Sequence, residues 1–486
     1  MNSAAGLPTL IQGGMGVAVS NWKLARAVSM RGQLGVVSGT VLDTVFVRRL
    51  QDGDVGGHMQ RAMTKFPIPG VAQRVLERFY LPEGRPADQP YRLLPMYRHL
   101  VSRERQQLTM LANFVEVFLA KEGHGNPVGI NLLTKVQMPN LPSLYGAMLA
   151  GVGYVLMGAG IPREIPGALD SLSQHRAASL RFDVEGIPSA ETVNLTLDPQ
   201  ELGADTTVTL TRPQFLPIIS ASSLATTLAR KANGSVEGFI VEGPTAGGHN
   251  APPRGEPRFN DRGEPLYGER DVVDLEKLRD LGLPFWLAGG TGSPERLCEA
   301  LAQGATGIQV GTLFAFCRES GFAEHLKRDV LDHAARGEVD VLTDPRASPT
   351  GYPFKVVRWA GDESADVIRE RKCDLGYLRL PYRRDDGRVD YRCSAEPVAD
   401  YVRKGGLEAD TEGRCCLCNS LTANIGQAQV RDGSEEPPLL TSGDDLATIA
   451  GFLRGRESYT ADDVIDYLFR LDDIPLGAPV LSAAGD

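Results

Sequence analysis

The sequence predicts an α/β fold, a (β/α)8 TIM barrel with a helical insertion and a C-terminal appended region that carries most of the cysteines. Eight short apolar runs alternate with helical stretches, which is the pattern of parallel strands joined by crossover helices. Nearly every run ends in Gly or a small polar residue, as expected where eight strand ends meet at one binding face. The length of 486 residues suits a barrel of about 250 residues with additions.

The predicted strands lie near residues 10, 35, 130, 155, 217, 240, 286 and 309. A helix is expected over Trp22–Met30, between the first two strands. The helix after the seventh strand has Ser293 as its expected N-cap, Pro294 at its first position and Gly304 just beyond its end. A doubly wound open sheet would give the same alternation, but the glycines that end the strands favour a barrel.

Two segments interrupt the alternation. Residues 51–125 are charged, rich in Arg and aromatic residues and helical in pattern, so we expect a helical insertion. Ala178–Val184 and Thr206–Thr211 have the period of strands and predict an inserted hairpin over about 178–211. We therefore assign residues 1–345 to the barrel and 346–486 to an appended region with a terminal helix around Asp462–Leu471.

Composition and charge restrict the class of partner. The chain is 42% hydrophobic and 23% charged, as in a globular protein, and its net charge of −10 argues against a nucleic-acid partner. The N-terminal residues lack the pattern of a secretory signal, so a cytoplasmic location is expected. Residues 136–162 carry no charge, but two prolines and several glycines split them into a short helix, a turn and a strand. No membrane partner is expected.

The last two strand ends, AGGTG and QVGT, predict a phosphate site. Barrels commonly bind phosphate with the loops after strands seven and eight, where Gly N–H groups point at the anion. The candidate residues are Gly289, Gly290, Gly311 and Thr312. Tight turns alone would also explain the glycines. Because no Walker-type lysine and no dinucleotide fingerprint is present, a mononucleotide is expected.

Flavin mononucleotide (FMN) has the shape required if a ring extends from that phosphate across the barrel mouth. Gly13, Gly14 and Met15 end the first strand, and Asn131 ends the third. Backbone groups and an amide of this kind can serve the pyrimidine edge of a flavin. Met15 as core filler and Asn131 as a turn residue are the simpler alternatives.

The stretch from Gly238 to Asn250, GFIVEGPTAGGHN, ends the sixth strand with a bare turn and one imidazole. Gly247 and Gly248 would let the backbone approach a flat ring closely. His249 is the candidate catalytic acid or base, because an imidazole needs no large pKa shift to work near neutral pH. A surface or satisfied core histidine is the alternative.

Several motifs in order carry a resemblance to a known family: IQGGMG, VGINLL, VEGPTAGGHN, LAGGTGSPERLCEALAQGATGIQVGT and TDPRASPTGYPFK. Together they resemble the nitronate monooxygenase family, formerly called 2-nitropropane dioxygenases, which shares its barrel with flavin-dependent enoyl-acyl carrier protein reductases. The resemblance covers residues 7–50 and 125–355. It implies an FMN-binding barrel over 1–345 in which the glycines, Met15, Asn131 and Thr312 named above hold FMN and His249 lies beside it.

The resemblance implies an FMN-dependent oxidoreductase that oxidises alkyl nitronates with O2 to carbonyl compounds and nitrite. His249 would position the anion or deprotonate a nitroalkane. The alternative is an NAD(P)H-linked reductase of enoyl thioesters on the same site. A flavin-bound or metal-bound binding subunit is a third option. The expected partner is thus a small molecule, a nitronate or an enoyl thioester, and a homo-oligomer stays open.

Five cysteines gather in the appended region: Cys373, Cys393, Cys415, Cys416 and Cys418. A disulfide set is not expected in a reducing compartment. Cys373, Cys393, Cys418 and either Cys415 or Cys416, of which we take Cys416, are candidate thiolate ligands of a metal or an iron–sulfur cluster. Buried small hydrophobes are the alternative.

The segment from Ser348 to Lys355, SPTGYPFK, is a stiff aromatic loop just past the barrel. Its position predicts either a wall over the flavin pocket, with Phe354 in it, or an anchor for the linker to the appended region.

Overall fold

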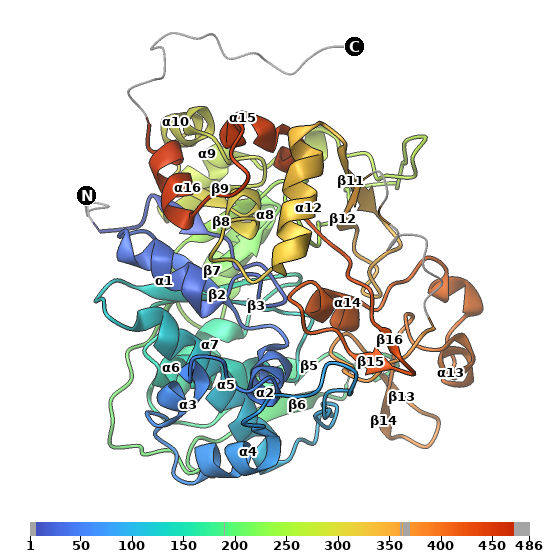
Figure 1. Ribbon diagram of the computed structural model, residues 1–486. Coiled ribbons are helices and arrows are strands. Elements are labelled where there is room, and N and C mark those ends of the chain that lie inside the picture. The colour runs from blue at the N-terminus through green and yellow to red at the C-terminus, as the bar shows by residue number, and fades with distance from the viewer. Residues whose placement is uncertain (1–5, 189, 360–361, 363–369, 471–486) are drawn as a thin grey trace.

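A closed ring of eight parallel strands forms the centre of the protein (Figure 1). The computed structural model describes residues 6–188, 190–359, 362 and 370–470. The barrel strands are β1 (Leu10–Gln12), β2 (Gly35–Ser38), β3 (Val128–Leu133), β4 (Tyr154–Gly158), β7 (Gln214–Ile219), β8 (Phe239–Glu242), β9 (Phe285–Ala288) and β10 (Gly307–Val310). They pair in the order β1-β10-β9-β8-β7-β4-β3-β2, and a parallel bridge between Ile11 and Leu34 joins β1 to β2. The predicted barrel and the places of its eight strands are confirmed.

Alternation along each strand separates the inside of the barrel from the helical layer. On β8, Ile240 packs in the interior cluster with Ile11, Leu156 and Trp286 from other strands. Its neighbour Val241 belongs to the outer cluster between strands and helices. Successive side chains point to opposite faces of a strand, so every second residue is directed into the barrel. The last inward residue of each strand therefore faces the mouth.

Helices surround the barrel and cover its outer face. They are α1 (Trp22–Met30), α5 (Arg103–Lys121), α6 (Asn140–Leu149), α7 (Ile165–Ser173), α8 (Ser222–Lys231), α9 (Leu275–Arg279), α10 (Pro294–Ala302), α11 (Thr312–Ala315) and α12 (Glu324–Ala335). Their ends follow local capping chemistry. Ser293 caps α10 by accepting from Arg296 N, Pro294 is the first helical residue and Gly304 has a φ of +86° beyond the C-cap, as predicted.

The two predicted interruptions are present, with one difference in detail. Helices α2 (Leu42–Gln51), α3 (His58–Met63) and α4 (Val71–Phe79) precede α5, which packs against α1 and α6 in the helical layer. The hairpin pairs β5 (Ala178–Phe182) with β6 (Val193–Leu197). The second strand predicted at Thr206–Thr211 is wrong, since that segment is irregular. The second strand of the hairpin is instead Val193–Leu197, which alternates between buried and exposed residues and begins thirteen residues before Thr206.

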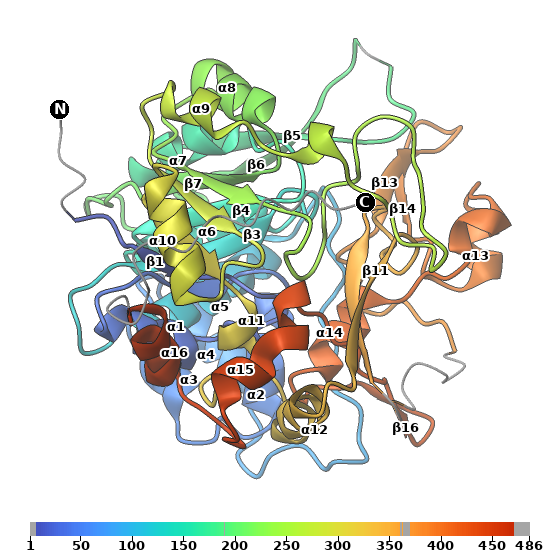
Figure 2. The same cartoon turned by 90° about the horizontal axis from the view of Figure 1, so that it is seen from above.

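The appended region wraps along the barrel rather than standing apart from it (Figures 1 and 2). Its elements are β11 (Val339–Asp344), β12 (Phe354–Trp359), β13 (Leu380–Arg383), β14 (Val389–Arg392), α13 (Val398–Arg403), η3 (Glu408–Thr411), α14 (Leu417–Ala423), β15 (Val430–Arg431), β16 (Ser434–Glu435), η4 (Asp444–Thr448), α15 (Ile449–Leu453) and α16 (Ala461–Leu468). A short 3-10 helix, η1 (Glu269–Asp271), lies earlier, between β8 and α9. Helix α16 packs on α1 and α10, while α15 packs on α12. The predicted boundary at 345/346 falls in the turn between the paired strands β11 and β12.

Two further expectations concern the terminal helix and a membrane-crossing helix. Leu471, the last residue of the predicted terminal helix, lies outside the described residues, and α16 ends at Leu468. Among the helices that the structure describes, none combines the length and the apolar character needed to cross a bilayer.

Candidate functional site

One cavity at the carboxyl ends of the barrel strands collects every residue predicted for the flavin site. The residues that line it include Gly13, Gly14, Met15, Asn131, Gly247, Gly248, His249, Gly289, Gly290, Gly311 and Thr312. They come from the ends of β1, β3, β8, β9 and β10. The barrel topology brings these strand ends together, because parallel strands present all their carboxyl ends at the same side. Whether these residues hold FMN stays a prediction.

The floor of the cavity, which the barrel strand ends form, contains two polar atoms without a hydrogen-bond partner among the described residues. Asn131 Nδ2 donates to Gly14 O at 2.9 Å, but Asn131 Oδ1 is buried and has no hydrogen bond among the described residues. Gln309 Oε1, on the inward face of β10, is also buried without a hydrogen bond among the described residues. A buried acceptor without a donor is costly. Both acceptors line the cavity, so they fit a ligand that brings N–H or O–H donors, as the flavin ring and its ribityl chain do.

Close packing explains why glycine stands at position 14. A Cβ on Gly14 would lie 2.2 Å from Asn131 Cβ and 3.1 Å from Val36 Cγ1. The bare backbone therefore lets the amide of Asn131 sit directly against the end of β1. This contact is what sets the position of the amide in the cavity.

The predicted phosphate end of the cavity is closed by the appended region. Thr312 Oγ1 donates a short hydrogen bond to Asp445 Oδ1 and accepts from Gly443 N at 3.2 Å. Gly289 has a φ of +92°, a conformation that favours glycine, and its N-terminal neighbour Ala288 ends β9. Burial raises the pKa of the Asp445 carboxyl, and the hydrogen bond from Thr312 opposes that rise.

His249 is held by the loop that follows β11. Its Nε2 lies 2.6 Å from Ser348 Oγ, which in turn lies 2.8 Å from Thr350 Oγ1. The ring of Phe354 packs edge-on against the imidazole with 4.8 Å between centroids. The turn around His249 also pairs with the start of β12, since Lys355 N donates to Gly248 O at 2.9 Å. Phe354 lines the cavity, so the loop forms a wall of it.

Burial, together with the nearby charge of Lys135, lowers the pKa of His249 to about 4. The expectation that this imidazole needs no large pKa shift is therefore wrong: the ring is neutral at pH 7 and is a weak base. Because Nε2 is engaged by Ser348, Nδ1 is the ring nitrogen that faces no hydrogen-bond partner within the described residues. A neutral imidazole can orient a substrate but cannot supply a positive charge.

Sequence reasoning missed three groups in the cavity. Glu242 ends β8 and lines the cavity, and burial raises its pKa to about 8. The signal in the sequence was its position in the run GFIVE. It lies two residues after Ile240, so both side chains are on the same face of the strand. Residues of the appended region also line the cavity, namely Tyr377, Leu378, Leu417, Cys418, Leu421, Thr441, Ser442, Gly443 and Asp445. The third is Gln309, which the motif GIQVGT contains.

Four of the clustered cysteines do meet around one small cavity. Cys373, Cys393, Cys416 and Cys418 all line it, and Cys418 also lines the cavity at the barrel mouth. Within the part of the chain that the structure describes, however, no three or more Cys, His, Asp or Glu side chains form a group that could hold a metal ion. The predicted metal or iron–sulfur site is therefore not confirmed and stays a prediction.

The four thiols lie close to one another near the start of α14. Cys416 is the N-cap of that helix, and Cys418 interacts electrostatically with Cys373, Cys393 and Cys416. Without a bound metal, burial raises the pKa of Cys373, Cys393 and Cys416 to about 12, whereas a coordinated metal ion would deprotonate such thiols.

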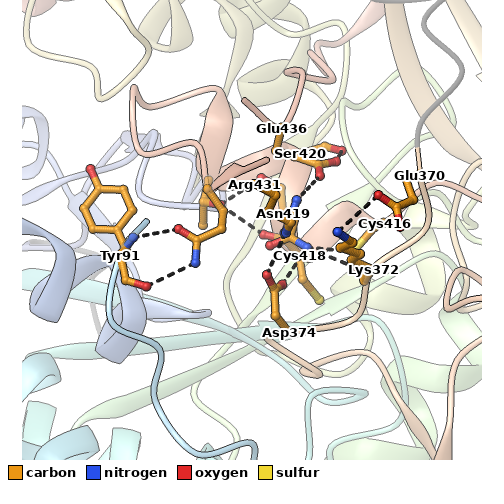
Figure 3. Close-up of polar contacts among 12 residues, drawn as sticks. Tyr91, Glu370, Lys372, Asp374, Cys416, Cys418, Asn419, Ser420, Arg431 and Glu436 are labelled. Atoms are coloured by element: carbon orange, nitrogen blue, oxygen red, sulfur yellow. Dashed lines mark hydrogen bonds and ion pairs between the residues drawn. The ribbon is translucent and has the colours of Figure 1, made fainter. Parts of the chain in front are cut away.

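A polar network fixes this region to the insertion (Figure 3). Asp374 accepts from Asn419 Nδ2 at 2.8 Å and forms an ion pair with Arg431 at 2.6 Å. Arg431 also pairs with Glu436 at 2.8 Å. Beside this cluster, Gln429 exchanges two hydrogen bonds with the backbone of Tyr91, which precedes α5. The network anchors α14 and thereby the cavity wall that α14 provides.

Comparison with known proteins supports the resemblance found in the motifs. A family model described as nitronate monooxygenase matches residues 184–347. A nitronate monooxygenase from Pseudomonas aeruginosa is 29% identical over 197 residues, which are 40% of this chain and 49% of that protein. The match thus spans about half the length of this relative. Both matches confirm the predicted relation to the nitronate monooxygenase family.

Solved structures with similar architecture were also found. FabK from Thermotoga maritima is 15% identical with a TM-score of 0.45, covering 95% of this chain and 91% of that chain. A nitroalkane oxidase from Streptomyces ansochromogenes is 15% identical with a TM-score of 0.43, covering 95% and 94%.

Proposed function

We propose that this chain is an FMN-dependent oxidoreductase of the nitronate monooxygenase type and that the cavity at the barrel mouth is its flavin and substrate site. The observation that carries the proposal is the floor of that cavity. Asn131 Oδ1 and Gln309 Oε1 are buried acceptors that lack donors within the described residues, and both point to a ligand with N–H and O–H groups.

Each group of residues has a proposed task. Gly289, Gly290, Gly311 and Thr312 would bind the phosphate, while Gly13, Gly14, Met15 and Asn131 would bind the ring. Gly247 and Gly248 would let the chain pass close to it. Bound FMN would supply the two-electron redox chemistry of the reaction.

His249 is proposed to act on the substrate through Nδ1. Ser348 fixes the orientation of the ring from the other nitrogen, and Phe354 limits its rotation. With its pKa near 4 the imidazole serves better to orient a nitronate than to deprotonate a nitroalkane. The preformed anion is therefore the substrate that this site favours within the monooxygenase reaction.

A second reaction, the NAD(P)H-linked reduction of an enoyl thioester, is favoured by one specific observation. Among the described residues that line the cavity there is no Lys or Arg, and the ionisable carboxyl groups are Glu242 and Asp445. Such walls suit an uncharged substrate better than an anion. This candidate uses the same flavin site and differs only in the substrate and the electron donor.

Two assays on the purified chain, reconstituted with FMN, test these proposals. Propionate 3-nitronate is added in air and nitrite is measured; in parallel, NADPH and an enoyl thioester are added without oxygen and NADPH absorbance is followed. Nitrite production supports the first reaction, and NADPH consumption that depends on the thioester supports the second. A chain that takes up no flavin on reconstitution would refute both.

A further inference from the structure

Glu242 is a carboxyl group on the floor of the flavin cavity that no role described above uses. It is the last residue of β8, and the alternation of that strand puts its side chain on the same face as Ile240, inside the barrel. The group lines the cavity. Among the described residues it makes no hydrogen bond and no ion pair; the next strand places Ala288 opposite it.

A carboxyl group in this position is mostly protonated at pH 7. Burial alone raises the pKa of Glu242 to about 8, because no cation or donor compensates for the lost water. In its neutral form a carboxylic acid has one O–H donor, which an ionised carboxylate lacks. The floor therefore holds two acceptors without donors, at Asn131 and Gln309, and one donor without an acceptor.

We propose that Glu242 binds the flavin as a neutral carboxylic acid and donates a hydrogen bond to it from the floor of the barrel. The inference rests on the proposed function, because it requires that FMN occupies this cavity. The flavin offers uncharged acceptors in its ring carbonyls, ring nitrogens and ribityl hydroxyls. Ionisation of Glu242 would remove the donor and set a negative charge against those acceptors.

The other titratable groups around Glu242 behave differently over the pH range that matters. His249 titrates near 4 and Tyr267 near 12, while burial raises the pKa of the Cys418 thiol well above its usual value. Asp445, the second carboxyl of the cavity, lies at the phosphate end, where Thr312 donates to it. On β9, the apolar Ala288 lies opposite Glu242, and on β7 the apolar Ile218 lies opposite Ile240, two residues before Glu242.

The test is the dissociation constant of FMN as a function of pH, measured on the full chain freed of flavin by quenching of flavin fluorescence. For the unaltered protein we expect a constant value from pH 6.5 to about 8, then a rise of up to tenfold per pH unit. Glu242→Gln keeps a neutral donor, so its affinity at pH 7 should lie within about threefold of the unaltered protein. Its affinity should not fall as the pH rises to 9.5.

Two controls identify the group that titrates. Asp445→Asn removes the other cavity carboxyl and should keep the full rise above pH 8. Riboflavin, which lacks the phosphate, should show the same rise as FMN, because the phosphate ionises near pH 6. If Glu242→Gln does not fold, FMN affinity as a function of pH in the unaltered protein and in Asp445→Asn tests the role of Glu242.

The outcomes separate this inference from the function on which it rests. Tight FMN binding with a flat profile to pH 9.5, a rise that persists in Glu242→Gln, or a rise lost in Asp445→Asn would overturn the role of Glu242 and leave the flavin proposal standing. Absence of FMN binding by the unaltered protein would remove both.

Discussion

The floor and the roof of the cavity are built in opposite ways. The floor consists of strand ends and glycine turns of the barrel, each within one short motif such as VEGPTAGGHN or GIQVGT. The roof comes from four separate parts of the appended region, the loop 348–355, the pair Tyr377 and Leu378, helix α14 and the segment 441–445. The floor depends on local pattern and barrel topology, whereas the roof depends on packing between residues far apart in the sequence. The following substitutions test how strongly the stability and the activity of the site depend on contacts between floor and roof.

Phe354→Ala should have the largest effect. The side chain is 2% exposed and packs on His249, so its removal leaves a cavity that costs about 3–5 kcal/mol in the free energy of unfolding. Urea unfolding followed by fluorescence gives that value, with Leu100→Ala, 82% exposed, as the control that should change it by less than about 0.5 kcal/mol. Unchanged stability and unchanged FMN affinity would show that the roof is dispensable.

His249 should make the protein less stable in acid. An ordinary histidine in the unfolded chain has a pKa near 6.5, whereas the folded value is about 4, so the unfolded state binds the proton first. Stability from this group is full above pH 6.5 and declines as the pH falls toward 4, by up to about 3 kcal/mol. His249→Gln should flatten this part of a plot of stability against pH. An identical decline in the variant would assign the effect to other groups.

Gly247→Ala tests the contact between floor and roof directly. A Cβ at this position would lie 2.7 Å from Ser442 C and 2.8 Å from Gly443 N, both backbone atoms of the segment 441–445. Overpacking of this kind costs about 1–3 kcal/mol. Thermal unfolding measures it, and Gly451→Ala is the matched control, because a Cβ there has no neighbour within 4 Å. Equal melting temperatures for the two variants would contradict the close contact.

Ser348→Ala should have the smallest effect on stability, about 1 kcal/mol, since it removes one hydrogen bond to His249. The informative measurement is turnover with the preferred substrate, which should fall while the affinity for FMN stays within about twofold. Ser348→Thr, which keeps the hydroxyl, should restore part of the lost turnover. Turnover unaffected by Ser348→Ala would remove the proposed orienting role.

The difference between floor and roof also explains what could be predicted from the sequence. The eight strands and the residues of the mouth were accessible because alternation, glycine turns and the closed parallel topology together put strand ends in one place. Asp445 and Gly443 carry no such signal, since their place beside Thr312 follows from the path of a chain more than a hundred residues long.

The chemical state of His249 could not be predicted for a related reason. The low pKa of His249 arises from burial by Phe354 and the loop around it, which the motif GGHN does not contain. The clustering of the cysteines in the sequence, in contrast, does correspond to four side chains around one small cavity. The pKa of a side chain depends on its surroundings, which a local motif does not contain.

The contact of the segment 441–445 with the predicted phosphate end of the cavity has a consequence for biosynthesis. The chain leaves the ribosome from its N-terminus, so strands β1 to β10 can pair before Thr441 to Asp445 have been made. At about 5–20 residues per second, translation of the stretch between β10 and this segment takes roughly 6–30 s. During that interval the residues of this segment cannot yet cover Thr312 at the mouth of the nascent barrel.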